Sequence, residues 1–174
     1  MKITANHEIF VLDNYPRQDL LLKDLGDYFE KHKDCQNRQT NVKATMTEWN
    51  LDLPSQEFIH FKNTIYTVAK ELNLYWACPF KIYSIWANIY RKGDHTVSHD
   101  HDPARYSFVY FLKSKSNFSP LLFEGINLKN KKKQWKEVKP IEGRLVIFPG
   151  FLKHRVPVHI HDETRITISG NFSQ

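Results

Sequence analysis

The residues best suited to chemistry stand in one short run, His99-Asp100-His101-Asp102, which leads into an apolar, aromatic segment. Imidazoles and carboxylates are ligands that transition metals accept readily. Side chains two positions apart on an extended segment point to the same side, so His99 and His101 can converge on one ion. In a chain with nine histidines, this clustering predicts half of a metal site.

The second half of the predicted metal site is His154, far downstream. An apolar segment ends at a Pro-Gly pair, and His154 follows the turn at the start of the next predicted strand. A lone histidine in such a place is more often an ordinary surface or core residue. Taken with His99 and His101, it is better explained as a third ligand held at a sheet edge.

The last predicted strand, 164–172, carries a guanidinium and hydroxyls on one face. Arg165, Thr167 and Ser169 alternate with isoleucines, so polar and apolar side chains face opposite ways. A guanidinium binds a carboxylate through two hydrogen bonds, and a hydroxyl two residues on can share it. Alone, the pattern also fits the exposed face of an edge strand. Beside a metal site, it predicts an anion-binding pair, Arg165 and Thr167.

In this order, the motifs resemble the 2-oxoglutarate- and Fe(II)-dependent oxygenase superfamily. The resemblance rests on His99-x-His101, the aromatic strand 106–112, the segment from Gly143 to Pro149, His154, and Arg165-x-Thr167. It covers residues 82–172. It is nearest to small oxygenases of the prolyl-hydroxylase-like branch, many of them encoded by bacteriophages and marine bacteria.

The resemblance implies a fold, two cofactors and roles for five residues. The fold is a double-stranded β-helix, a jelly-roll or cupin-like form of the mainly β α+β class, with Fe(II) at its open end. His99, His101 and His154 are then the iron ligands, and Arg165 with Thr167 holds the far carboxylate of 2-oxoglutarate. Decarboxylation of this co-substrate to succinate drives oxidation of a substrate C–H bond, which makes the protein a dioxygenase of the hydroxylase type.

One position departs from the pattern of the superfamily. The second ligand there is an acid, part of a face of two histidines and one carboxylate, whereas this chain has His101. Either His101 replaces the carboxylate, or the loop shifts so that Asp100 or Asp102 reaches the metal. The spacing favours His101, and a site of three histidines changes the charge of the metal centre.

Side chains on the strands around the metal motif are candidates for a substrate pocket. Trp86, Asn88 and Tyr90 alternate along the strand before it, and Ser107 lies on the strand after it. For Trp86, core packing is the simpler explanation. The substrate, whether a protein or peptide side chain or a small molecule, is left open because specificity resides in loops.

The length of 174 residues suits one domain with a single sizeable core. We expect this domain over 1–174, with a helical support region at 1–78 and a β-core at 79–174. Two cysteines, Cys35 and Cys78, lie far apart and are expected to be free thiols of a reducing cytoplasm. No apolar run spans a membrane and no signal peptide begins the chain, so we expect a cytoplasmic protein, in the host cytoplasm if phage-encoded.

Two helices and a series of short strands are expected to position these residues. A strand is expected at 9–12, an extended segment at 40–47, and amphipathic helices from Arg17 to His32 and from Pro54 to Leu72. After Pro79 the period changes to two. This change predicts strands at 81–90, 95–99, 106–112, 120–124, 134–139, 144–148, 153–158 and 164–172.

Positive charge is concentrated in one predicted loop, 129–136, although the whole chain has a net charge of +6. The run contains Lys129, Lys131, Lys132, Lys133 and Lys136. A solvated hairpin loop is the simple explanation, and a guide for an anionic substrate or nucleic acid is the alternative. A nucleic-acid demethylase of this superfamily typically has a second arginine soon after the first, and none follows Arg165 here.

Two other functions fit part of the pattern. A cupin-like enzyme with three histidine ligands that does not use 2-oxoglutarate explains the histidines but leaves Arg165 and Thr167 without a role. A jelly-roll binding module without catalysis treats the histidines as surface residues and predicts no tight metal binding. Turnover of 2-oxoglutarate separates the first from the oxygenase, and metal binding separates the second.

Overall fold

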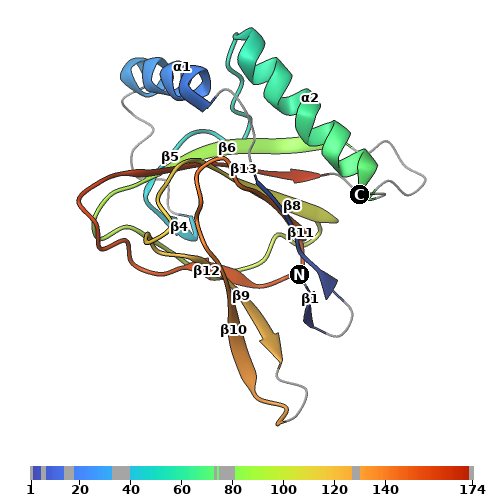
Figure 1. Ribbon diagram of the computed structural model, residues 1–174. Coiled ribbons are helices and arrows are strands. Elements are labelled where there is room, and N and C mark those ends of the chain that lie inside the picture. Colours follow the sequence, from blue (N-terminus) through green and yellow to red (C-terminus); the bar gives the residue numbers. More distant parts are fainter. Residues whose placement is uncertain are drawn as a thin grey trace.

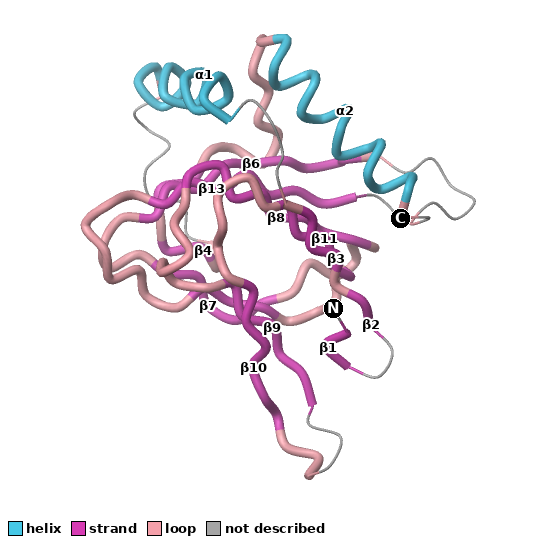
Figure 2. Tube along the Cα trace, viewed as in Figure 1, coloured by secondary structure: helices cyan, strands magenta, loops and turns pink. Residues whose placement is uncertain are grey.

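The computed structural model describes residues 2–4, 7–13, 18–32, 40–72, 74, 81–126 and 130–172. These residues form two helices and thirteen strands (Figures 1 and 2). The helices are α1 (Gln18–Lys31) and α2 (Gln56–Glu71). The strands are β1 (Lys2–Thr4), β2 (His7–Glu8), β3 (Phe10–Leu12), β4 (Val42–Lys43), β5 (Thr45–Met46), β6 (Ile82–Tyr90), β7 (His95–His99), β8 (Tyr106–Lys113), β9 (Leu121–Ile126), β10 (Lys133–Val138), β11 (Leu145–Pro149), β12 (His154–Val156) and β13 (Arg165–Phe172).

Two antiparallel sheets form the body of the protein. The larger sheet has six strands in the order β3-β11-β8-β13-β6-β5, and the smaller sheet has five in the order β10-β9-β12-β7-β4. Strands far apart in the sequence are neighbours in both, as β13 lies between β6 and β8. This arrangement is the double-stranded β-helix, so the predicted mainly β fold class with supporting helices is confirmed.

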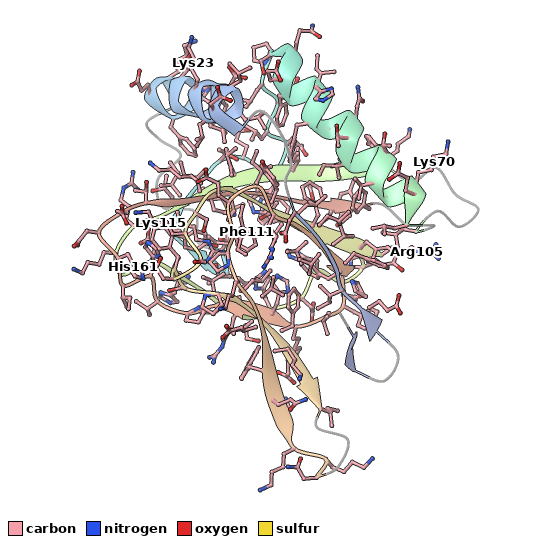
Figure 3. The ribbon with its side chains drawn as sticks, in the orientation of Figure 1. Lys23, Lys70, Arg105, Phe111, Lys115 and His161 are labelled. Atoms are coloured by element: carbon pink, nitrogen blue, oxygen red, sulfur yellow. The ribbon has the colours of Figure 1, made fainter. Side chains whose placement is uncertain are left out.

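Strand alternation divides the interior into two cores. On β8, Phe108, Tyr110 and Leu112 belong to the core between the larger sheet and the helices, whereas Val109 and Phe111 belong to the core between the sheets. In Figure 3, Phe111 lies at the centre of the molecule. The period of two thus places each of these apolar side chains on a buried face. Burial of each large apolar side chain stabilises the fold by about 1.5–3 kcal/mol.

Both helices lie on the outer face of the larger sheet (Figure 1). Ser55 caps α2, because its hydroxyl accepts a hydrogen bond of 3.1 Å from the backbone N–H of Phe58. Phe58, Phe61 and Ile65 follow at helical spacing and are fully buried against the sheet. This helical layer stiffens the larger sheet, whose opposite face borders the space between the two sheets.

The predicted elements are found with shifts of one or two residues at most ends. The extended segment 40–47 divides into two short strands in different sheets, with β4 beside β7 and β5 beside β6. Together with β3, these strands show that residues 1–78 contribute to both sheets as well as to the helices. Cys35, Cys78 and Lys129 lie outside the described residues. Neither described helix is long and apolar enough to cross a bilayer.

Candidate metal centre

Three histidines from the smaller sheet meet at one point. His99 ends β7, His101 follows two residues later, and His154 begins β12, which pairs with β7 so that His154 lies opposite His99. The ring centroids are 4.4 Å apart for His99 and His154, and 5.0 Å apart for each pair that includes His101. One nitrogen from each ring lies within 4.8 Å of the others. Three ring nitrogens this close together could hold one metal ion.

Two of the rings are oriented by their own strands. Nδ1 of His99 lies 2.9 Å from the carbonyl oxygen of Val97, and Nδ1 of His154 lies 2.9 Å from that of Leu152. A carbonyl oxygen only accepts, so each Nδ1 donates its proton and each Nε2 keeps its lone pair. The unprotonated nitrogens are therefore those available to a metal.

All three imidazoles are held in the neutral form. Burial, with a smaller effect of the neighbouring His99, lowers the pKa of His101 to about 3. Burial is also the main cause that lowers the pKa of His99 and places the pKa of His154 well below its usual range. Because a protonated imidazole cannot bind a cation, this environment prepares the site for a metal at neutral pH.

A glycine joins the two halves of the site. The Gly150 carbonyl accepts a hydrogen bond of 2.7 Å from the backbone N–H of His101, and the Gly150 N–H donates one of 3.0 Å to the carbonyl of Arg105. A β-carbon at position 150 would overlap the backbone of Ala104. The turn before His154 can therefore approach the loop of His101 only because residue 150 has no side chain.

A narrow inner cavity of about 30 Å³ connects the histidines with the last strand. His99, His101 and His154 form part of its wall, and Arg165 and Thr167 form another part. The two groups come from different sheets, so their meeting depends on closure of the β-helix. The structure thus brings the predicted metal ligands and the predicted anion-binding pair into one cavity.

Arg165 is a buried cation without an anion. It is 1% exposed, and one of its terminal N–H groups donates a hydrogen bond of 2.6 Å to the carbonyl of Ser119. Its Nε has no hydrogen-bond partner, and no acidic side chain of the described residues forms an ion pair with it. The rings of Tyr90 and Phe111 lie 5.0 Å from the guanidinium carbon. Burial lowers the pKa of Arg165 to about 10, so it stays charged.

The neighbours of Arg165 are polar and partly unsatisfied. Nδ2 of Asn88 donates to the Thr167 hydroxyl at 3.3 Å, while Oδ1 of Asn88 has no partner. The Tyr90 hydroxyl lies 2.7 Å from that of Thr96, and burial raises the Tyr90 pKa. A buried charge and buried polar atoms without partners are costly. An anion with several oxygens is therefore the kind of ligand that this end of the cavity fits.

The four predicted pocket residues divide into two groups. Trp86, Asn88 and Tyr90 line the inner cavity, and Trp86 is 3% exposed with its ring 5.7 Å from that of His101. Trp86 therefore packs in the core and also lines the inner cavity. Ser107 lines neither hollow next to the histidines, and its place in a substrate pocket stays a prediction. It lies further along β8, buried, where its hydroxyl donates to Oδ1 of Asn171 at 2.7 Å.

Other residues of the site were not predicted. The Thr96 hydroxyl contacts that of Tyr90 across the two sheets, and the short turn between β6 and β7 was the signal that could have brought the two residues together. Trp49, from a polar segment, packs edge-on against Trp86 at 4.7 Å. No local pattern indicated this contact, because Trp49 reaches the site through a loop.

The β9–β10 hairpin extends away from the body (Figure 1), and of the described lysines of the basic run, Lys131 to Lys133 lie at or next to its end, whereas Lys136 lies further along β10, opposite Phe123. Lys131, Lys132, Lys133 and Lys136 are exposed. Lys133 forms an ion pair of 2.8 Å with Glu124. The hairpin strand β9 borders β12, but its lysines line neither hollow of the metal centre.

A double-stranded β-helix with three histidines at one point and a buried guanidinium beside them defines the class of site, one that can hold a single metal ion next to an anion. The family comparison is more specific. Residues 84–171, half of the chain, match the family model described as "Putative 2OG-Fe(II) oxygenase". The chain belongs to this family and is a 2-oxoglutarate- and Fe(II)-dependent oxygenase. None of the curated proteins gives a significant match.

Solved structures share the fold at low sequence identity. A prolyl-4-hydroxylase from Pseudomonas putida is 16% identical with a TM-score of 0.72, over 98% of this chain and 94% of that one. The viral collagen prolyl hydroxylase of Paramecium Bursaria Chlorella virus-1, in a 2-oxoglutarate complex, is 10% identical with a TM-score of 0.64, over 94% of each chain. SnoN, an α-ketoglutarate-dependent epimerase from nogalamycin biosynthesis, is 10% identical with a TM-score of 0.72, over 97% of this chain and 78% of that one.

Proposed function

We propose that His99, His101 and His154 together hold the Fe(II) of this oxygenase. The observation that carries the proposal is the meeting of three neutral imidazoles with the unpaired Arg165 in one cavity. His101 takes the place of the acid in the usual pattern. It lies on the same side as the other two rings, whereas Asp102 is exposed and Asp100 accepts a backbone N–H of its own turn at 3.4 Å.

Arg165 and Thr167 bind the far carboxylate of 2-oxoglutarate in this proposal. The guanidinium supplies the charge that an anion needs and an unused Nε–H, and the Thr167 hydroxyl lies on the same face of β13. From the neighbouring strand, Asn88 orients Thr167 through a hydrogen bond, and the ring of Tyr90 packs against the guanidinium of Arg165. The inner cavity is narrow, so we expect its side chains to move apart when 2-oxoglutarate binds.

The bound iron and 2-oxoglutarate supply the oxidation: one atom of O2 enters the substrate C–H bond as a hydroxyl, the other enters succinate, and CO2 leaves. The protein positions the reactants and excludes water from the site. The carbonyls of Val97 and Leu152 fix two imidazoles, and Arg165 fixes the co-substrate. Val109 and Leu121 line the cavity with apolar surface and exclude water from it.

The substrate in this proposal is a peptide side chain or a small molecule, hydroxylated at carbon. Two similar folds are named as prolyl hydroxylases and another as an epimerase acting in nogalamycin biosynthesis, which supports hydroxylation and either kind of substrate. Nucleic acid is the less favoured substrate, because the described lysines of the basic run line neither hollow of the metal centre. A cytoplasmic location and a phage origin remain predictions.

Anaerobic titration with Fe(II), with and without 2-oxoglutarate, tests the assignment. The chelate of iron and the keto acid gives a weak visible charge-transfer band, which we expect only when both are added. Arg165→Ala should weaken the band and raise the 2-oxoglutarate concentration needed, while Arg165→Lys restores part of the binding. Arg105→Ala, an exposed arginine outside the cavity (Figure 3), is the matched control.

The possible results separate the alternatives. Iron binding without the band at any 2-oxoglutarate concentration would favour the cupin-like enzyme. A folded protein that binds no iron would favour the binding module. For the second ligand, His101→Gln should abolish iron binding, whereas Asp100→Asn and Asp102→Asn should leave it in place. The reverse result would assign the ligand to a carboxylate.

A further inference from the structure

A second, wider hollow of about 720 Å³ lies next to the metal centre. It shares His99, His101 and Trp86 with the inner cavity, so a molecule bound in it is adjacent to the proposed iron site. Its wall includes aromatic and charged side chains, namely Lys43, Trp49, Tyr83, Trp86, Asp100 and Asp102. Because the inner cavity is occupied by the co-substrate in the proposed function, this outer hollow is the place left for a substrate.

Aromatic rings lead from the histidines into the outer hollow. The Trp86 ring lies 5.7 Å from that of His101, and the Trp49 ring packs edge-on against Trp86 at 4.7 Å. Trp49 is 41% exposed and Tyr83 is 50% exposed. Large aromatic faces left open beside a reactive centre attract apolar groups and, through the charge distribution of the ring, cations.

Two carboxylates stand at the inner end of the same hollow. Asp100 and Asp102 flank His101 in the sequence and line the wall, and neither forms an ion pair with any part of the chain that the structure describes. Unpaired carboxylates next to open aromatic faces form a surface that favours a positively charged group.

The one described cation in this wall, Lys43, lies away from the carboxylates. The register pairs Lys43 with His95, whereas Asp100 follows His99, five residues further along the same strand direction. At about 3.3 Å per residue, the backbones of Lys43 and Asp100 are roughly 16 Å apart along the strand. Lys43 therefore leaves the acidic end of the hollow free.

The three neutral imidazoles add no charge to the loaded centre, and Fe(II) and the dianion of 2-oxoglutarate cancel. The remaining charge of +1 belongs to Arg165, which lines the inner cavity but not the outer hollow. The wall itself has two carboxylates against one ammonium, a net charge of −1. The wall of the outer hollow is therefore negative, although the whole chain has a net charge of +6.

We propose that the outer hollow binds the substrate of this oxygenase through a positively charged nitrogen group, an ammonium or a guanidinium, which lies over Trp49 and against Asp102. The substrate class is then a basic side chain in a peptide or a small amine. This inference rests on the proposed function, because it assigns the substrate of the same site.

The test measures peptide binding by calorimetry to the anaerobic protein loaded with Fe(II) and 2-oxoglutarate. The probes are acetylated and amidated Gly-Ala-Lys-Ala-Gly, its arginine and norleucine versions, and butylamine. We expect a basic peptide to bind about 10-fold more tightly than the norleucine peptide, which has the same length without the charge. A peptide that binds more tightly than butylamine identifies a peptide substrate, and the reverse identifies a small amine.

Two variants locate the contact. Trp49→Ala should weaken binding of the basic probe about 3- to 10-fold and that of the norleucine peptide less, because the ring also attracts apolar groups. Asp102→Asn should weaken binding of the basic probe about 2- to 5-fold and leave that of the norleucine peptide unchanged. Glu30→Gln, which removes an exposed carboxylate on α1, is the control and should change nothing. Asp102 is exposed, so its variant is expected to fold.

The charge-transfer band, measured in the same samples, keeps the two proposals distinct. Absence of the band contradicts the proposed function itself. A normal band with equal binding of the charged and norleucine peptides overturns the cationic substrate and leaves the oxygenase assignment intact. If both variants still bind the basic probe more tightly than the norleucine peptide, the proposed contact with Trp49 and Asp102 is also overturned, because the charged group then binds elsewhere.

Discussion

The two sheets of the β-helix differ in how their strands are built. In the larger sheet, β6, β8 and β13 have eight or nine residues, and nearly every residue of β8, β11 and β13 is buried because helices cover one face and the smaller sheet the other. In the smaller sheet, β7 has five residues and β12 three, with a register shift between them. The larger sheet is thus a rigid frame, and the smaller sheet presents the histidines at its strand ends.

The difference teaches that stability and metal binding are separable in this molecule. Most of the buried apolar side chains of the two sheets are on the larger sheet, although the smaller sheet adds several, such as Leu121 and Phe123. The three histidines come from two short strands of the smaller sheet and the loop after β7. Arg165 is the exception, since it extends from the frame into the cavity. Changes in the frame should lower the free energy of unfolding, and changes around the histidines should lower metal affinity first.

The largest expected effect is on metal binding. His154→Asn removes a ligand while keeping a polar side chain of smaller size, so we expect the Fe(II) affinity to fall by at least about 100-fold and 2-oxoglutarate turnover to fall to background. The melting temperature of the metal-free protein should change little. A large loss of stability in the absence of metal would mean that the smaller sheet also carries the fold.

Gly150→Ala should weaken metal binding through the backbone. A methyl group at this position overlaps the backbone of Ala104, so the loop of His101 must move away from the turn before His154. We expect a 10- to 100-fold loss of Fe(II) affinity, of about the size seen when groups that orient metal ligands are removed. Titration of iron into the variant checks this, and unchanged affinity would show that the loop can adjust without cost.

In the frame, Gly170→Ala should destabilise the protein by about 1–3 kcal/mol. A β-carbon there would lie 2.6 Å from the Phe108 ring and 2.7 Å from the carbonyl oxygen of Ser84. Gly26→Ala is the matched control, because no atom lies within 4 Å of its added methyl group and alanine favours the helix by about 1 kcal/mol. Urea unfolding of both variants without metal should give effects of opposite sign.

Acid should weaken the metal-free protein through the histidine cluster. The His101 pKa is about 3 in the folded protein against 6.5 in the unfolded chain, so between these values the unfolded state binds the proton. Stability therefore falls as the pH drops below about 6.5, by about 1 kcal/mol per pH unit. Urea unfolding from pH 7 to pH 5 measures the slope, and His101→Gln should reduce it.

The smallest effect is expected from an ion pair at the edge of the frame. Arg144 donates from Nε and a terminal nitrogen to the two carboxylate oxygens of Asp13, at 2.6 and 2.9 Å, and this hydrogen bonding lowers the Asp13 pKa. Asp13 is partly exposed, so Asp13→Asn should cost only about 0.5 kcal/mol at pH 7. The stabilisation is present at neutral pH and is lost as the pH falls through the folded pKa of Asp13. Thermal unfolding of the wild type and of Asp13→Asn at pH 7 and at pH 3 measures this loss.

The sequence predicted the frame well because its signals are local. Alternation on β8 and β13 comes from side chains that face two different cores, and the helix spacing of Phe58, Phe61 and Ile65 comes from one buried face. The family, the enzyme class and both cofactors were also predicted and are confirmed. The spacing of His99 and His101 was informative for a similar reason, since the two residues are only two positions apart, one at the end of β7 and one in the loop that follows.

What the sequence did not predict depends on closure of the sheets. Trp49 reaches the site through a loop whose carbonyl accepts the N–H of Ile85, a contact between distant segments. Ser107 shares a strand face with Val109, and only the length of β8 places it beyond the cavity. Periodicity gives the face of a residue but not its position along the barrel axis, and the latter decides which side chains meet.

The bonds from the rings of His99 and His154 to carbonyls two residues earlier have a consequence for engineering. Each ring has a hydrogen bond within its own tripeptide, Val97–His99 or Leu152–His154. The orientation of these two ligands is therefore largely local, and it requires of a host scaffold two adjacent antiparallel strand ends in matching register, whereas His101 also needs the contact of its loop with Gly150. A designer could transplant these two tripeptides into an unrelated barrel and expect the imidazoles to arrive already oriented.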